Sequence, residues 1–250
     1  MEPARVLKSH NEPRNIAELY IDSRQSYLTN PADIKINISH IFGSRKFTKI
    51  KLKECCIPNL EYPVGSHNNL LVFQENGVAV DINITLSEGA YDGNSMATEL
   101  QTQLNGAGAN TYVVTFDSLS KRLSVSLSVG TSFNFTTGTA LDVLGFTATG
   151  FVASYIGDNP VRLDGDDYYF LEVSGHSFVN YSSLGKHDVL AKIHVDVPYG
   201  NVMYYQDNGE DYLTMRSANF DYVDVRLVSP TGRSVVLPSN CHASYTLMFY

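Results

Sequence analysis

Apolar residues at every second position are the feature of this chain that most restricts its fold. The alternation runs through 34–38, 80–86, 123–129 and 189–197, where Ile, Val, Leu and Ala alternate with mostly polar residues. Successive side chains of a strand point to opposite faces, so each segment has one apolar and one polar face. Strands of a parallel sheet covered on both sides would be continuously apolar. The pattern therefore predicts half-buried antiparallel strands in a sandwich or barrel.

Strand-like segments extend over most of the chain. The ranges expected to form strands are 19–21, 34–41, 47–56, 69–74, 78–86, 111–117, 122–129, 132–136, 167–174, 187–197, 212–215, 219–229, 235–237 and 244–250. Residues 118–121 are expected to form a hairpin loop between two of them.

One segment has a helical spacing instead. Met96, Ala97, Leu100 and Leu104 follow a turn cluster at 89–93. Asn94 or Ser95 is the candidate N-cap, and the glycines at 106 and 108 are expected to end a helix of about three turns. Residues 140–144 are expected to form one further helical turn.

The chain shows no long repeat and no linker. Residues 1–18 hold two prolines, several charges and no periodicity, which is typical of an extended arm. Residues 19–250 are predicted to form a single domain, with an insertion at about 88–160 that contains the helix and a hairpin.

The net charge of -8 is unevenly distributed. Residues 1–53 carry ten Lys and Arg against five acids, whereas the rest carries eight against 21. Such a basic segment can bind nucleic acid or the acidic surface of another copy. Self-association is the favoured hypothesis, because the segment lacks interleaved aromatic residues and the acidic remainder would repel phosphate.

Targeting signals are not expected from the sequence. No stretch of about 18 apolar residues is present, and the first thirty residues are polar and charged, so we predict neither a membrane span nor a secretory signal. Cys55 and Cys56 are adjacent and Cys241 is remote, which matches neither a zinc spacing nor a CxxC motif. These are predicted to be buried or edge thiols in a reducing compartment.

Catalytic motifs are not apparent in the sequence. It contains no GxSxG elbow, HExxH motif, P-loop or dinucleotide fingerprint. Four histidines fall in the second half, at positions 176, 187, 194 and 242. His194 lies between Ile193 and Val195, on the polar face of its expected strand, where a solvated side chain is the favoured interpretation. We predict no catalytic residue, no cofactor and no metal ligand.

Two acidic clusters allow more than one interpretation. Asp164, Asp166 and Asp167 can hold calcium through carboxylate oxygens, but Asp-Gly-Asp-Asp is also common in turns, and the spacing is not that of an EF-hand. Asp207, Glu210 and Asp211 form a second acidic loop. Either loop can instead receive basic residues of a neighbouring copy.

Sixteen tyrosines and no tryptophan give the chain an unusual aromatic composition. Tyrosine combines a large apolar ring with a polar tip, which suits subunit interfaces as well as ordinary sheet packing. Carbohydrate-binding sandwiches also use exposed aromatic residues, although they favour tryptophan.

Several segments, taken in order, resemble a viral family. They are ELYIDSRQSY at 18–27, IKINIS at 34–39, LKECCIPNLEYPV at 52–64, NNLLVF at 68–73, ITLSEGAYDGNSMATELQTQLN at 84–105, LDVLGF at 141–146 and SPTGRSVVLPSNCHASYTLMFY at 229–250. Together they resemble the penton and minor capsid proteins of virophages, polinton-like viruses and giant viruses, which are tailless icosahedral DNA viruses.

The resemblance implies an all-β jelly roll, made of two antiparallel sheets, with a helix-plus-hairpin insertion. It also implies a structural, non-enzymatic role in a virion that is assembled in the host cytoplasm or a virus factory. Since major capsid proteins of this lineage are longer, the length favours a penton: a homopentamer at the five-fold vertex that contacts the major and other minor capsid proteins.

Other functions stay open at this point. The nearest alternative is a peripheral minor capsid protein or vertex spike, and the next is a receptor- or carbohydrate-binding sandwich. A cupin-like metalloprotein would need clustered histidines with a carboxylate on neighbouring strands.

Overall fold

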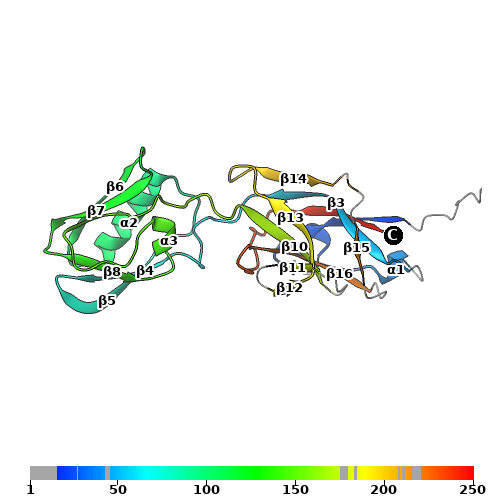
Figure 1. Ribbon diagram of the computed structural model, residues 1–250, viewed down its shortest axis with the longest axis horizontal. Coiled ribbons are helices and arrows are strands. Elements are labelled where there is room, and N and C mark those ends of the chain that lie inside the picture. The colour runs from blue at the N-terminus through cyan, green and yellow to red at the C-terminus, as the bar shows by residue number, and fades with distance from the viewer. Residues whose placement is uncertain are drawn as a thin grey trace, which may run out of the picture. The chain divides into compact units, whose positions relative to one another are not determined.

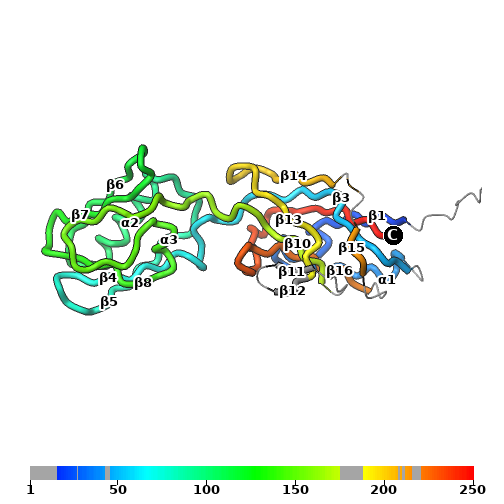
Figure 2. The backbone as a smooth tube through the Cα atoms, in the orientation of Figure 1, coloured from blue at the N-terminus to red at the C-terminus, as the bar shows by residue number. Residues whose placement is uncertain are grey.

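The chain forms two compact units in the computed structural model (Figure 1). The first consists of Met1–Glu61 and Asp166–Tyr250, and the second of Tyr62–Gly165. The structure describes residues 16–26, 28–42, 46–174, 188–207, 209, 212–215 and 221–250, and the backbone alone of 180–182 and 185–187. The tube in Figure 2 follows the chain out of the first unit after β3 and back into it before β10.

Strands dominate the first unit. They are β1 (Ala17–Asp22), β2 (Asp33–Asn37), β3 (Lys49–Pro58), β10 (Tyr168–Ser174), β11 (Asn180–Ser182), β12 (Gly185–His187), β13 (Val189–His194), β14 (Val202–Gln206), β15 (Leu213–Thr214), β16 (Tyr222–Val228) and β17 (Ser244–Phe249). The helical elements described in this unit are the 3-10 turn η1 (Ser23–Gln25) and the short helix α1 (Ser39–Phe42).

A five-stranded and a four-stranded antiparallel sheet contain the main strands. Sheet A has the order β1-β17-β3-β14, with β15 also paired to β3, and sheet B has the order β13-β10-β16-β2. The pairing is nested along the chain: β1 with β17, β2 with β16, β3 with β14 and β10 with β13. An antiparallel ribbon wrapped in this way is a jelly roll, so the predicted fold class is confirmed.

The core of the first unit follows from the alternation. In β10, Tyr169, Leu171 and Val173 are buried, whereas their neighbours are partly exposed. At one end of the sheets the rings of Phe42, Phe47 and Phe249 pack with centroids 5.1 to 5.6 Å apart. Burial of these faces supplies the main stabilisation of the sandwich.

The second unit contains two three-stranded sheets and a helix. One sheet has the order β5-β4-β8, from β5 (Val78–Thr85), β4 (Leu70–Glu75) and β8 (Phe133–Thr137). The other has the order β6-β7-β9, from β6 (Thr111–Asp117), β7 (Arg122–Val129) and β9 (Ser154–Ile156). Helix α2 (Gly93–Ala107) and the single turn α3 (Leu141–Leu144) contribute to the same core.

Helix α2 confirms the predicted helix and its end at Gly108, but not its N-cap. Its N-cap is Asp92 rather than Asn94 or Ser95, because the Asp92 carboxylate accepts a 2.7 Å hydrogen bond from the Ser95 backbone N–H. At the other end Gly108 has φ -86°, which any residue adopts. A Cβ at Gly108 would lie 2.3 Å from Glu75 Oε1, so close approach, not a left-handed turn, requires glycine there.

Glu75 explains that close approach. Its buried carboxylate accepts hydrogen bonds from the backbone N–H groups of Ala109 (2.8 Å) and Asn110 (3.2 Å) and from the Tyr112 hydroxyl (2.7 Å). These donors satisfy a charge that would otherwise be costly to bury. The interaction joins β4 to the turn between α2 and β6.

Several strand predictions need correction. The expected strand 34–41 ends at Asn37, because the Asn37 side chain accepts from the Ser39 backbone N–H at 3.0 Å and α1 begins there. Residues 235–237 form no strand, but Val235 N–H bonds the carbonyl of Leu227 beside β16. Strands β9, β11 and β14 were not predicted from the sequence, and β12 was predicted only at its last residue.

The predicted chain divisions differ in their bounds from the strands and units of the structure. Residues 17 and 18 of the expected arm begin β1, and residues 1–15 lie outside the described residues. The segment 88–160, expected as an insertion, lies within the second unit, which begins at Tyr62 and ends at Gly165.

Candidate functional site

Side chains of the kinds used in catalysis are scattered through the structure. Among the described residues, no group of three or more His, Cys, Asp or Glu side chains is placed to hold a metal ion. His194 and His242 are both exposed, on β13 and in the loop before β17. His176 and the side chain of His187 lie outside the described residues.

The first acidic cluster takes part in an ion-pair group. Arg233 Nη2 lies 3.3 Å from Asp166 Oδ2, and Arg233 Nη1 donates a hydrogen bond to Glu61 Oε1. Asp167 contributes its backbone carbonyl, which accepts from Val195 N–H at 2.9 Å. Glu61 is the last residue of the first unit before the second begins, and Asp166 is the first residue after it. Arg233 therefore links the two chain segments that flank the second unit.

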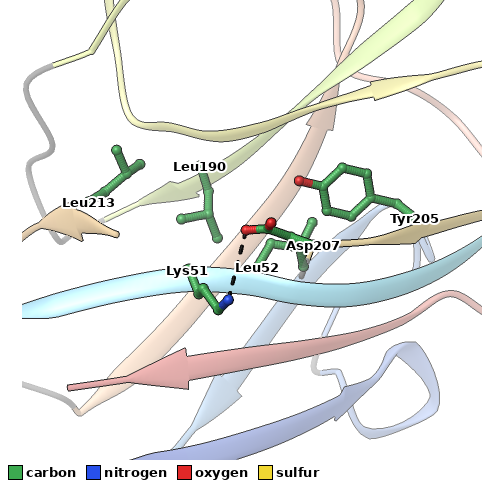
Figure 3. Close-up of a pocket in the computed structure, with 6 residues that line it drawn as sticks. All are labelled: Lys51, Leu52, Leu190, Tyr205, Asp207 and Leu213. Carbon is green, nitrogen blue, oxygen red and sulfur yellow. Dashed lines mark ion pairs between the residues drawn. The ribbon is translucent and has the colours of Figure 1, made fainter. Parts of the chain in front are cut away.

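The second acidic loop borders a pocket in the first unit, drawn in Figure 3. Asp207 follows β14, and its Oδ1 accepts from Gly209 N–H at 2.7 Å. Its Oδ2 lies 3.9 Å from Nζ of Lys51, a β3 residue that is almost fully buried. Lys51 Nζ donates to the Gly209 carbonyl at 2.7 Å. The other two acids of this loop, Glu210 and Asp211, lie outside the described residues.

The pocket has a volume of about 220 Å³ and mixed walls. Lining side chains come from β3, β13, β14, β15 and the loop after β14; they are Lys51, Leu52, Leu190, Tyr205, Asp207 and Leu213. In Figure 3 the Asp207 carboxylate lies between Leu190 and Tyr205. Three leucines beside a carboxylate, a phenol and the Lys51 ammonium can receive an aliphatic group that carries hydrogen-bonding atoms.

The outer face of sheet A carries an ordered polar network. Lys53 Nζ lies 3.0 Å from Glu18 Oε1, and the Tyr20 hydroxyl donates to Glu18 Oε2 at 2.9 Å. On the neighbouring strands the hydroxyls of Thr246 and Tyr204 reach the two Glu54 oxygens at 3.0 and 3.5 Å. The hydrogen bond from Lys53 lowers the pKa of Glu18.

This network changes how the charge asymmetry is understood. Lys51 and Lys53, both in the basic first 53 residues, make ion pairs within their own chain, and so does Arg24, which binds Asp22. Three basic residues of this segment are therefore already paired with acids of the first unit.

The cysteines are free thiols in the structure. Cys55 is buried, and Cys56 and Cys241 are partly exposed. Burial raises the pKa of the Cys55 thiol to about 12, which makes it a poor nucleophile. The expected burial is confirmed for Cys55; Cys56 lies on β3, which has strands on both sides, and Cys241 lies in a loop, so neither is an edge thiol.

Comparison with solved structures bears on the fold of the whole chain. The crystal structure of the mavirus penton protein matches with a TM-score of 0.53 at 13% sequence identity, over 94% of this chain and 99% of that one. The chain has a penton-like jelly-roll fold. No family model and no curated protein matches the sequence. Within the described residues, no helix is both long and apolar enough to cross a membrane.

Proposed function

We propose that this chain is a structural protein of an icosahedral virus capsid and that it forms the five-fold vertex as a homopentamer. The supporting observation is the extent of the match to the mavirus penton protein, which covers 94% of this chain. A jelly roll alone is shared with lectins and cupins. A match of that extent must also include most of the second unit. The jelly-roll fold of lectins and cupins does not by itself imply such a unit.

A closed ring requires a heterologous contact, in which one surface of a copy meets a different surface of the next. Sheet A offers two unlike edges for this purpose, β1 on one side and β14 with β15 on the other. The second unit adds a different electrostatic character, since it holds nine Asp and Glu against three Lys and Arg. Unlike surfaces of this kind favour a ring over a symmetric dimer.

The remaining parts of the proposal concern partners and location. The protein would contact the major capsid protein and other minor capsid proteins, and it would be found in virions assembled in the host cytoplasm or a virus factory. No catalytic role is proposed. A peripheral minor capsid or vertex-spike position is the nearest alternative within the same class.

The test measures assembly and location together. Native mass spectrometry and sedimentation of the full chain should show a cyclic pentamer, and imaging of particles should place the chain at vertices. A chain that stays monomeric at all concentrations and is absent from particles would refute the proposal. A chain found in particles away from the vertices would support the minor capsid alternative.

Exposed tyrosines favour a second candidate, a carbohydrate-binding surface. Tyr20 and Tyr204 lie on the outer face of sheet A with 68% and 56% of their surface exposed, and hydrogen bonds to Glu18 and Glu54 orient them. A glycan array probed with the full chain tests this candidate. Binding that is lost in Tyr20→Ala and Tyr204→Ala would support it, and a blank array would exclude it.

A further inference from the structure

The two edge strands of sheet A have backbone groups that no other described strand uses. The sheet begins with β1 and ends with β14, and within the part of the chain that the structure describes each of them pairs with one neighbour only. An open edge presents a row of N–H and C=O groups that can bind a further strand. Both edges are therefore candidate interaction surfaces.

Neither edge of sheet A has the protection that edge strands usually carry. Natural edges are commonly blocked by lysine, proline or a bulge. The edges of sheet B follow this rule, since β2 contains Lys35, and β13 contains Lys192 and has a register shift in its ladder with β10. In contrast, β1 and β14 contain neither Lys nor Pro, and their ladders have no register shift. Such edges are expected where another strand covers them.

The ladder of β1 shows which of its backbone groups are free. The Ser23 N–H donates to the Ala243 carbonyl at 2.9 Å, at the end of the ladder between β1 and β17. Hydrogen-bonded pairs alternate along an antiparallel ladder, so the odd-numbered residues of β1 bond to β17. The even-numbered residues direct their N–H and C=O groups away from the sheet, and these are Glu18, Tyr20 and Asp22.

The same reasoning applies to β14 at the other edge. The Asn59 N–H donates to the Asn201 carbonyl, and the Asp207 N–H donates to the Lys53 carbonyl, both at 2.8 Å. The odd-numbered residues of this segment therefore bond to β3. The even-numbered residues direct their backbone groups outward, and these are Val202, Tyr204 and Gln206.

Strand direction allows these two edges to pair with each other between copies. The four strands β1, β17, β3 and β14 alternate in direction, so β1 and β14 run in opposite directions. If β14 of one copy lies beside β1 of the next, the new pair is antiparallel. The residues with free backbone groups on both strands carry the side chains of the outer face, so the outer faces of the two sheets would be continuous.

The charges of β1 favour β14 over a second β1 as its partner. Pairing of β1 with itself about Tyr20 would place Glu18 directly opposite Asp22 twice, and like charges in that position are destabilising. No residue of β14 is charged. Tyr20 and Tyr204 are also among the more exposed aromatic side chains, and an aromatic cross-strand pair is stabilising.

We propose that sheet A continues from one copy of this chain to the next by antiparallel pairing of β14 with β1. The register with the largest overlap makes three hydrogen-bonded pairs, with two hydrogen bonds in each. The pairs are Glu18 with Gln206, Tyr20 with Tyr204, and Asp22 with Val202. This inference rests on the proposed function, because it supplies the head-to-tail contact that a ring requires.

Proline substitutions test whether the free backbone groups make the contact. Tyr20→Pro and Tyr204→Pro each remove an outward N–H and leave the bonds to β17 and β3 in place, which edge strands tolerate. Tyr20→Val and Tyr204→Val are the matched controls, since they keep the N–H. In sedimentation of the full chain we expect each proline variant to associate at least tenfold more weakly than its valine control. Equal association of the proline and valine variants would overturn the proposal.

A disulfide experiment tests the register and does not depend on the proline variants folding. Glu18→Cys and Gln206→Cys are prepared as separate proteins and oxidised alone or mixed, and the disulfides are assigned by peptide mapping because Cys56 and Cys241 are partly exposed. We expect a disulfide between residues 18 and 206 in the mixture only. In the control mixture of Glu18→Cys with Val202→Cys the two residues lie about 13 Å apart, too far to link.

Other disulfide patterns would refute the contact. If residue 206 links only to residue 206, two β14 strands pair symmetrically and the proposed partner is wrong. If no mixture gives a link between 18 and 206, while the proline variants are excluded from particles, a strand of another capsid protein covers these edges and the proposal is overturned.

The contact and the vertex function fail in different ways. If the wild-type chain forms a closed five-membered ring without a link between residues 18 and 206, only the edge contact is wrong. If the link forms in filaments or in rings of another size, the edge contact is supported and the five-fold vertex is wrong. A chain that stays monomeric at all concentrations would overturn both.

Discussion

Substitution of Arg233 tests how much its ion pairs stabilise the first unit where the chain leaves it and returns to it. Its guanidinium binds Glu61 and Asp166, the two residues that flank the second unit in sequence. The Glu61 side chain is only 9% exposed, so water cannot easily replace its partner. The substitution Arg233→Gln removes the positive charge and leaves this carboxylate without its cation.

The size of the effect follows from burial. Breaking a fully buried pair costs about 3–5 kcal/mol. Here Arg233 and Asp166 side chains are 26% and 28% exposed, so solvent recovers part of that loss. We expect the free energy of unfolding of the first unit to fall by about 2–3 kcal/mol. For a protein of this size that corresponds to a loss of about 4–12 °C in Tm.

Arg226 provides the matched control. It pairs with Asp224 at 3.4 Å, and its side chain is 50% exposed, so Arg226→Gln should cost less than about 1 kcal/mol. Urea unfolding followed by tyrosine circular dichroism gives both values. Hydrogen exchange should also rise at residues 58–61 and 166–170 in Arg233→Gln only. Equal effects of the two substitutions, or no change in exchange, would refute the reasoning.

Three further predictions concern single side chains. Gly108→Ala should destabilise the second unit by about 2 kcal/mol, since its Cβ would displace the Glu75 carboxylate, whereas Gly106→Ala, with no atom within 4 Å of the new Cβ, should be neutral or stabilising in thermal unfolding. The Cys55 thiol, with its pKa raised to about 12 by burial, should react with iodoacetamide at pH 8 far more slowly than the other two cysteines; equal rates in a mass-spectrometric time course would contradict this. A hydrogen bond from the neighbouring arginine lowers the pKa of Asp22 to about 2, so its contribution to stability should be complete above about pH 4 and lost as the pH falls towards 2; urea midpoints of Asp22→Asn should show a shallower acid decline.

Local patterns of the sequence predicted much of the second unit. The strands at 111–117 and 122–129 and the loop between them appear with the expected bounds, because β6 and β7 are neighbours in sequence and their alternation is regular. The N-cap of α2 was misplaced because Asp, Asn and Ser all cap helices, and only the turn geometry selects Asp92.

Alternation alone overstated how much of each strand is buried. In β5, Ile84 is buried, but Val80, on the same face, has 64% of its surface exposed. An apolar side chain is buried only where another element covers it, and that covering is a property of the fold. The pocket had no sequence signal for the same reason, since Lys51 and its acceptor Gly209 are 158 residues apart.

The sequence by itself determined that this chain is an antiparallel β protein, because a two-residue period permits only half-buried strands and can be seen within a few residues. It also identified the helix and the irregular stretch around it. Only the tertiary structure decided the nested pairing of β1 with β17 and β3 with β14, and the meeting of Arg233 with Glu61 and Asp166. Those contacts join residues far apart along the chain, and their free energy depends on burial and register, which no local pattern encodes.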